Sequence, residues 1–407
     1  MPVSNVRAVR GEPPYLASLD GLRALAVALV VMTHAAFLTG YVVTGGMAGR
    51  IWGRGDFGVA IFFSLSGFLL YRSLVAQDAR GGMRLRAYWW RRAARILPAY
   101  WLALAAVALV VQPPPRSVLL HATATQVYVA DLGIPGFTQS WSIATELAFY
   151  AVLPLLVLGL RPLRRRDPSS PLRTLIVMGL AGLALTWIIG GGEIGREPLY
   201  ERWLPARLPN FVLGMILAEA LAQPGHALSA WIRSVAASPW SAICLAGSAY
   251  LLATTPVAGA LTLGGVGGDL DLAVKMLLSC IVAFGLMVPL LWGPDNAYRS
   301  LLTHPASRYL GRISYGIFLW HLAVFEGLYA LSGLAVFAGG MLPLLTIGVP
   351  LTLALAALSY HYLEQPTSRW VSRRLHRSQE ARGSASSARS PETRDPTTAR
   401  GPRQGPR

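Results

Sequence analysis

Apolar residues recur in long runs from Leu22 to Tyr362, and short segments rich in arginine separate these runs. Several runs approach the roughly 20 residues with which a helix, rising about 1.5 Å per residue, crosses about 30 Å of hydrocarbon. The pattern predicts an all-α fold, a polytopic membrane bundle of about ten transmembrane helices. The predicted spans are Leu22–Val43, Phe57–Leu74, Ile96–Gln112, Ser142–Leu160, Leu172–Gly190, Pro209–Ala222, Trp240–Thr255, Leu272–Trp292, Ile313–Leu331 and Met341–Tyr362.

Arginines are distributed unevenly between alternate loops of this pattern. With a cytoplasmic N-terminus, the inner loops 72–95, 161–173, 223–238 and 293–312 hold sixteen arginines, and the outer loops hold six. Ten more follow Tyr362. Because short cytoplasmic loops are enriched in Arg and Lys, we expect both termini inside the cell (N-in/C-in) and a multi-pass protein of the cytoplasmic membrane.

The amino-acid composition indicates which binding partners and ligands to expect. Only 14% of the residues are charged, against roughly a quarter in soluble domains, so a lipid bilayer is the expected environment. The formal net charge of +17 does not indicate nucleic acid, since the basic residues lie between apolar spans and in the tails. The two cysteines, Cys244 and Cys280, fall within apolar runs and indicate neither a disulfide nor a zinc site. We expect no metal and no bound cofactor.

The chain is expected to have three parts. Residues 1–17 form a cytoplasmic N-terminal segment, residues 18–371 the membrane domain, and residues 372–407 a basic cytoplasmic tail. From about Ser378 the tail consists mainly of Ser, Pro, Arg, Gly and Thr. Such a composition buries too little surface to offset its conformational entropy, so we expect disorder there. Within the membrane domain, Val118–Ala130 is expected to be re-entrant or interfacial.

His34 is an ionisable residue deep in the first predicted span, roughly 18 Å from its cytoplasmic end. Such residues in hydrocarbon are costly and mark functional sites by default. Arg23 lies eleven residues earlier, and eleven steps of 100° place both side chains on one helix face. A neutral imidazole could accept a proton from an attacking hydroxyl. The alternative, a histidine that merely bonds a neighbouring helix, stays open.

Arg92 and Arg95 lie three residues apart where the third span begins, so they share a helix face. Guanidinium groups bind phosphate oxygens through two parallel hydrogen bonds. The pair therefore indicates a phosphate-bearing ligand at the cytoplasmic side. The alternative is an ordinary basic cluster that sets the topology, flanked by aromatic residues of the membrane interface.

Glu146 lies about one turn inside the outer end of the fourth span, where a carboxylate facing lipid would be unstable. It is expected to face the interior. There it could orient His34, stabilise an imidazolium, or hydrogen-bond sugar hydroxyls. A structural ion pair with an arginine such as Arg207 is the alternative.

The ninth span carries Tyr315 and His321, six residues apart and hence on different faces. Considered by itself, His321 is expected to be structural more than catalytic. Ser66 and Gly67 are expected to permit close helix packing, as small residues do in membranes.

Together these segments resemble the acyltransferase-3 family of integral membrane O-acyltransferases. The resemblance covers essentially Ser18 to Trp370, and the order and spacing of its segments are more specific than any one of them. It rests on LDGLRALAVALVVMTHAAF, GVAIFFSLSGFLL, WWRRAARILPAYW, SWSIATELAFYAVLP, RLPNFVLGMILAE, ISYGIFLWH and YHYLEQPTSRW.

The resemblance implies a ten-helix domain that takes acyl groups from acyl-coenzyme A and passes them to glycans, lipids or secondary metabolites. It implies a catalytic base at His34 and donor-binding arginines at Arg23, Arg92 and Arg95. The Trp-Ser…Glu segment of the family corresponds to Trp141, Ser142 and Glu146. We take Glu146 with His34 as catalytic candidates, and the substrate- or donor-binding candidates further include Trp141, Ser142, Tyr315 and His321. Many relatives have two adjacent acids in this segment, whereas Leu147 follows Glu146 here. The chain itself is predicted to complete transfer of an acyl group, acetyl in the first instance, to a hydroxyl.

A transporter or flippase is the rival hypothesis. In that case the buried His, Glu and Arg side chains would form a proton relay or a substrate path, and the arginine pair would serve topology alone.

Overall fold

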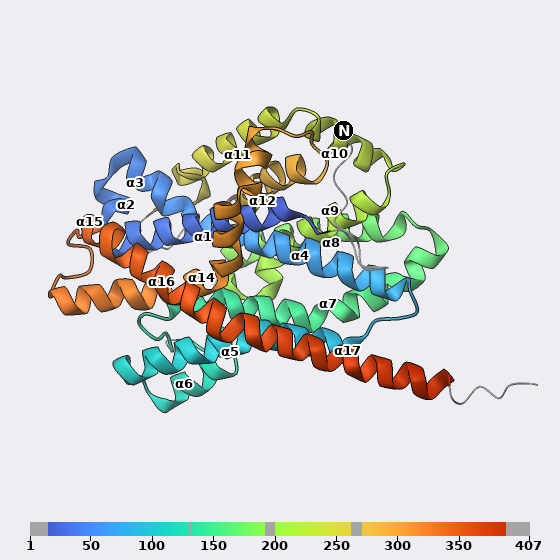
Figure 1. Cartoon of the computed structure of the whole chain (residues 1–407). Helices are drawn as coiled ribbons and strands as arrows, with labels where there is room; N and C mark the ends of the chain where they lie inside the picture. Colours follow the sequence, from blue (N-terminus) through green and yellow to red (C-terminus); the bar gives the residue numbers. More distant parts are fainter. Residues whose placement is uncertain (1–14, 131, 192–199, 262–270, 388–407) are drawn as a thin grey trace, which may run out of the picture.

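The structure is a computed structural model that describes residues 15–130, 132–191, 200–261 and 271–387 (Figure 1). In these ranges the regular elements are all helices, which confirms the predicted all-α bundle. Most of the predicted N-terminal segment and residues 388–407 of the predicted tail lie outside the described residues.

Nine helical stretches of the described chain are long and apolar enough to cross a membrane. A tenth is added if α10 (Ala227–Ala236) and α11 (Pro239–Ala253), which meet at 91°, count as one span. The prediction of about ten spans is therefore confirmed. The predicted span Trp240–Thr255 differs from the others, because α11 alone has 15 residues and gains sufficient length only together with α10. The N-in/C-in orientation stays a prediction.

The other long helices are α1 (Ala17–Leu38), α4 (Phe57–Asp78), α5 (Leu85–Val111), α7 (Trp141–Arg166), α8 (Ser170–Gly191), α9 (Leu204–Ala222), α12 (Asp271–Leu291) and α14 (Pro305–Ser332). Short helices connect them: α2 (Tyr41–Thr44), α3 (Gly46–Gly53), α6 (Pro115–Ala122) and α13 (Ala297–Thr303). The predicted re-entrant or interfacial stretch Val118–Ala130 contains the end of α6 and a single 3₁₀ turn, Gln126–Tyr128.

The last helical stretch runs through α15 (Met341–Pro343), α16 (Val349–Ser359) and α17 (Gln365–Ser387), with π-helical turns at Leu344–Gly348 and Tyr360–Glu364. Figure 1 shows α17 (red) passing along one side of the bundle and beyond its end. Disorder was predicted from about Ser378, and for residues 378–387 the structure corrects this, since α17 continues to Ser387. Gln379, Glu380 and Ala381 are good helix formers that extend an already nucleated helix.

Glycines set the closest helix contacts. A Cβ on Gly67 of α4 would lie 2.0 Å from the carbonyl oxygen of Phe211, and one on Gly214 of α9 would lie 2.0 Å from that of Ser64. The predicted packing role of Gly67 is confirmed. Similarly, a Cβ on Gly311 of α14 would lie 1.7 Å from the carbonyl oxygen of Asp20 on α1. Because these positions have no side chains, the backbones of α4 and α9 come into contact, and so do those of α1 and α14.

Candidate active site

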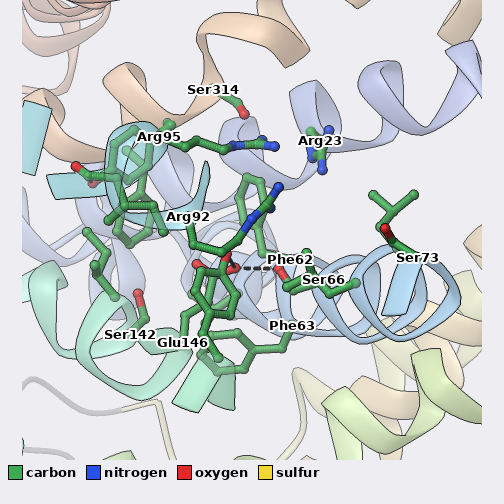
Figure 2. Close-up of a pocket in the computed structure, with 18 residues that line it drawn as sticks. Arg23, Phe62, Phe63, Ser66, Ser73, Arg92, Arg95, Ser142, Glu146 and Ser314 are labelled. Carbon is green, nitrogen blue, oxygen red and sulfur yellow. Dashed lines mark hydrogen bonds between the residues drawn. The ribbon is translucent and has the colours of Figure 1, made fainter. Parts of the chain in front are cut away.

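A cavity of about 220 Å³ lies between α1, α4, α5, α7 and α14 (Figure 2). Most of the residues singled out in the sequence line it, although they come from five different helices. Its lining residues are Arg23, Val59, Phe62, Phe63, Ser66, Leu69, Leu70, Ser73, Arg92, Arg95, Ile96, Ser142, Ile143, Glu146, Tyr150, Ser314, Tyr315 and Phe318. We call this space the inner cavity.

Three guanidinium groups converge in the inner cavity. Figure 2 shows the side chains of Arg23, Arg92 and Arg95 extending into the same space. Arg23 pairs with Asp20 at 3.1 Å, whereas Arg92 and Arg95 form no hydrogen bond or ion pair within the described part of the chain. Three arginines against the single carboxylate Glu146 give the lining a formal charge of +2. Unpaired guanidinium donors in such a cavity favour an anionic ligand.

Glu146 is fixed by two hydroxyl groups. The hydroxyl of Ser66 donates a hydrogen bond to Glu146 Oε1, and that of Tyr150 donates to the same oxygen at 2.8 Å. In the described residues it forms no ion pair with Arg207, which instead lies 3.8 Å from Glu201 and stacks over Trp141 at 5.1 Å. The alternative of a Glu146–Arg207 pair is therefore wrong.

The contacts of Ser66 correct its predicted role in packing. Its hydroxyl orients Glu146 across the interface between α4 and α7, while the neighbouring Gly67, together with Gly214, provides the close approach to α9. A serine beside a glycine in an apolar run looks like a packing pair, so the sequence carried no signal that separates the two roles. Tyr150, one helical turn after Glu146, was likewise not singled out.

His34 and His321 form a pair of their own. Their facing nitrogens, His34 Nδ1 and His321 Nε2, lie 3.1 Å apart. His34 Nδ1 also lies 2.9 Å from the carbonyl oxygen of Val30, and His321 Nδ1 lies 3.1 Å from that of Ile317. His321 is fully buried, whereas part of His34 remains accessible.

These partners assign the tautomers of the pair. A carbonyl oxygen can only accept, so Nδ1 of His321 carries the hydrogen that it donates to Ile317. Neutral His321 then has a bare Nε2, which accepts from Nδ1–H of His34. Nε2 of His34 is consequently the nitrogen with the free lone pair. The pairing also identifies the neighbour to which His34 bonds, on a helix 287 residues further along the chain.

Aromatic rings separate the histidine pair from the inner cavity. Neither histidine lines that cavity, but Phe318 does, and its ring centroid lies 5.9 Å from that of His321. Phe62 also lines the cavity and meets Phe318 edge to face at 6.4 Å. We call Phe62 and Phe318 the aromatic partition. The arginine cluster therefore lies in the inner cavity, whereas the histidine pair lies outside it, in contact with Phe318.

The remaining candidate residues either line the inner cavity or pack outside it. Ser142 and Tyr315 line the inner cavity, and the hydroxyl of Tyr315 donates to the carbonyl oxygen of Ile96 at 2.9 Å. Trp141 does not line it, because its ring packs against Phe63 and under Arg207. In the described ranges no group of three or more His, Cys, Asp or Glu side chains is placed to hold a metal ion.

A second cavity, of about 660 Å³, adjoins the first. Arg23, Arg95, Ser314 and Tyr315 line both, so the two spaces meet at these residues. Its outer walls come from the start of α14, the segment before α1 and the face of α17 that includes Arg369 and Arg373. We call this space the vestibule.

A helical bundle that crosses the membrane and encloses a basic cavity defines a polytopic membrane protein with an internal polar site. The acyltransferase-3 family, described as an acyltransferase domain, matches residues 16–361, and the chain belongs to this family. The resemblance noted in the sequence is thereby confirmed.

Two relatives illustrate the likeness. The O-acetyltransferase OatA of Staphylococcus aureus is 26% identical over 379 residues, which cover 87% of this chain and 57% of that protein. The peptidoglycan O-acetyltransferase OatA of Listeria monocytogenes is 27% identical over 351 residues, covering 78% of this chain and 50% of that protein. The chain thus spans between 50% and 57% of the length of these relatives. No solved structure matches the chain.

Proposed function

We propose that this chain is a membrane O-acyltransferase that moves an acyl group, acetyl in the first instance, from acyl-coenzyme A to a hydroxyl. The acceptor class is a glycan, a glycolipid or a secondary metabolite, and the name of the Listeria relative, a peptidoglycan O-acetyltransferase, favours a glycan. The observation that carries the proposal is the convergence of Arg23, Arg92 and Arg95 on a cavity that ends one aromatic ring away from a paired histidine.

The donor would enter through the arginine cluster. The diphosphate of coenzyme A needs several hydrogen-bond donors and positive charge, and Arg92 and Arg95 have guanidinium groups uncommitted within the described chain. Polar groups that line the cavity, Ser142 among them, would contact the pantetheine arm. Glu146, held by Ser66 and Tyr150, does not bond His34, so we assign it to accept a hydrogen bond from a ligand hydroxyl.

The length of the donor fits the distance to the base. Arg23 and His34 are eleven residues apart on α1, a rise of roughly 16 Å. The pantetheine arm is comparable to about four residues of extended chain, roughly 13–14 Å. A thioester whose phosphates lie beside Arg23 would therefore come within roughly 2–3 Å of the level of His34, once the rings of Phe62 and Phe318 rotate aside.

His34 would act as the general base. As the acceptor oxygen attacks the thioester carbonyl, its proton passes to Nε2 of His34, and the imidazolium forms. The new C–O bond replaces the C–S bond, and the leaving thiolate takes the proton back from His34. His321 would act as a positioning residue, because its Nε2 accepts from Nδ1–H of His34 and stabilises the imidazolium.

Incubation of the purified protein with radiolabelled acetyl-coenzyme A tests this proposal. An acyltransferase releases free thiol and labels an added hydroxyl acceptor without any ion gradient. A transporter leaves the thioester intact and moves its substrate only between compartments. Intact donor after prolonged incubation with glycan, glycolipid and small-molecule acceptors would contradict the proposal.

A further inference from the structure

The face of α17 that lines the vestibule carries a polar stripe within a membrane-spanning stretch. Gln365, Ser368, Arg369, Ser372 and Arg373 all line the vestibule. They follow each other at steps of three, one, three and one residues, which places them on one side of the helix. The two arginines are four residues apart and therefore adjacent on this face. A helix that only returned the chain to the cytoplasm would not need such a stripe directed into a cavity.

The opposite wall adds further positive charge. Arg312 of α14 also lines the vestibule, and the complete lining contains five arginines against Asp20 and Glu364, a formal charge of +3. Arg312, Arg369 and Arg373 form no hydrogen bond or ion pair with any residue that the structure describes. The guanidinium of Arg312 lies 5.9 Å from the ring centroid of Tyr309.

Arg374, on the same helix, has a different orientation from the two arginines that line the vestibule. Arg374 directly follows Arg373, yet it does not line the vestibule and lies 4.7 Å over the ring of Trp370. Both count equally in the positive-inside rule, which is indifferent to helix face. The rule alone therefore does not explain why Arg369 and Arg373 are directed into the cavity.

The sizes of the two cavities indicate which part of a ligand each could hold. Small-molecule sites in proteins usually occupy about 300–1,000 Å³. The vestibule, at about 660 Å³, falls within this range, whereas the inner cavity, at about 220 Å³, suits a narrow chain. Arg23 and Arg95, which line both spaces, stand at the junction.

We propose that the vestibule binds the nucleotide end of the acyl donor, with Arg312, Arg369 and Arg373 binding the phosphate monoester on its ribose. The diphosphate would then lie at the junction beside Arg23 and Arg95, and the arm in the inner cavity. This assignment rests on the proposed function for its ligand. It adds to that function a second phosphate site, formed by α14 and α17.

The test compares donors that differ by this phosphate alone. Binding of coenzyme A and of 3′-dephospho-coenzyme A is measured by calorimetry on purified protein in vesicles of zwitterionic lipid. We expect the wild type to prefer coenzyme A by about 10- to 100-fold, the worth of one charge-assisted hydrogen bond. The variant R369Q/R373Q should bind both compounds with similar affinity, and R312Q should lose part of the preference. The matched control R374Q should keep the full preference.

Binding of 3′-dephospho-coenzyme A also serves as the folding control, because its affinity should be unchanged in all variants. A wild type without preference, or R369Q/R373Q with an undiminished preference, would overturn the assignment. So would arginine variants that differ from the wild type only in vesicles with anionic lipid, because the phosphate would then belong to a lipid headgroup. Failure of the proposed function is distinguishable, since a protein that binds coenzyme A in this manner yet transfers no acyl group retains the phosphate site.

Discussion

Replacing His321 by leucine removes the acceptor that faces Nδ1–H of His34, 3.1 Å away, and leaves the bond to Val30 intact. In the resting enzyme the lost bond joins two neutral groups and is worth about 0.5–1.5 kcal/mol. In the transition state His34 becomes an imidazolium, and a bond to a charged group is worth about 1.5–3 kcal/mol. The bond is therefore stronger by about 1–1.5 kcal/mol when the reaction needs it, so kcat should fall by roughly five- to tenfold.

Initial rates at varied acetyl-coenzyme A separate this effect from general damage. Because the aromatic partition stands between His321 and the inner cavity, the KM for the donor should stay within about twofold of wild type. His321→Gln offers a carbonyl oxygen as a replacement acceptor, so it should recover most of the lost kcat. His321→Leu is the matched variant that fills the buried space without an acceptor.

Two results would refute the reasoning about this pair. Full kcat in His321→Leu would show that the second histidine contributes nothing to the transition state. An equal fall in kcat for the Leu and Gln variants, accompanied by a raised KM, would indicate that His321 supports packing alone.

Three further outcomes are expected. His34→Ala should lower acyl transfer by about 10²–10⁴-fold while donor binding persists; retention of more than about a tenth of wild-type activity would exclude His34 as the general base. The double variant Arg92→Lys/Arg95→Lys keeps the charge but loses the planar guanidinium groups, so apparent donor affinity should weaken by about 10- to 100-fold with a smaller change in turnover. If donor affinity and topology are both unchanged, the two arginines act only in setting the topology. A reporter fused after Ser387 should read cytoplasmic and one inserted at Ala258 external; the opposite reading at either site would contradict the N-in/C-in arrangement.

The helical architecture could be predicted from the sequence because burial in lipid imposes a single strong constraint. Each span must be long and apolar, and nearly every predicted span has its counterpart in a long helix. The α10–α11 segment was less predictable, since a 91° bend leaves hydropathy unchanged. The helical continuation of α17 past Ser378 was missed because composition was given more weight than the helix that precedes it.

The site was only partly predictable. Arg23, Arg92, Arg95 and Glu146 stand out as charges in apolar surroundings, and the structure brings them together around one cavity. The pairing of His34 with His321 is a tertiary contact that no spacing within either helix encodes. Arg369 and Arg373 were counted only among the ten arginines that follow Tyr362, because in the sequence nothing distinguishes them from Arg374, which the structure directs elsewhere.

The aromatic partition has a consequence for the membrane as a whole. An enzyme that takes a water-soluble donor from one side and serves an acceptor deep in the bilayer risks opening a leak for protons and ions. Phe62 and Phe318 line the inner cavity that holds the arginine cluster, and Phe318 also contacts His321, the partner of His34. Their apolar rings offer no partner to a hydrated ion or a chain of water molecules. We therefore expect the resting protein, with both rings in place, to hold back water and ions, and Phe318→Ala to raise the proton leak of vesicles that contain the purified protein.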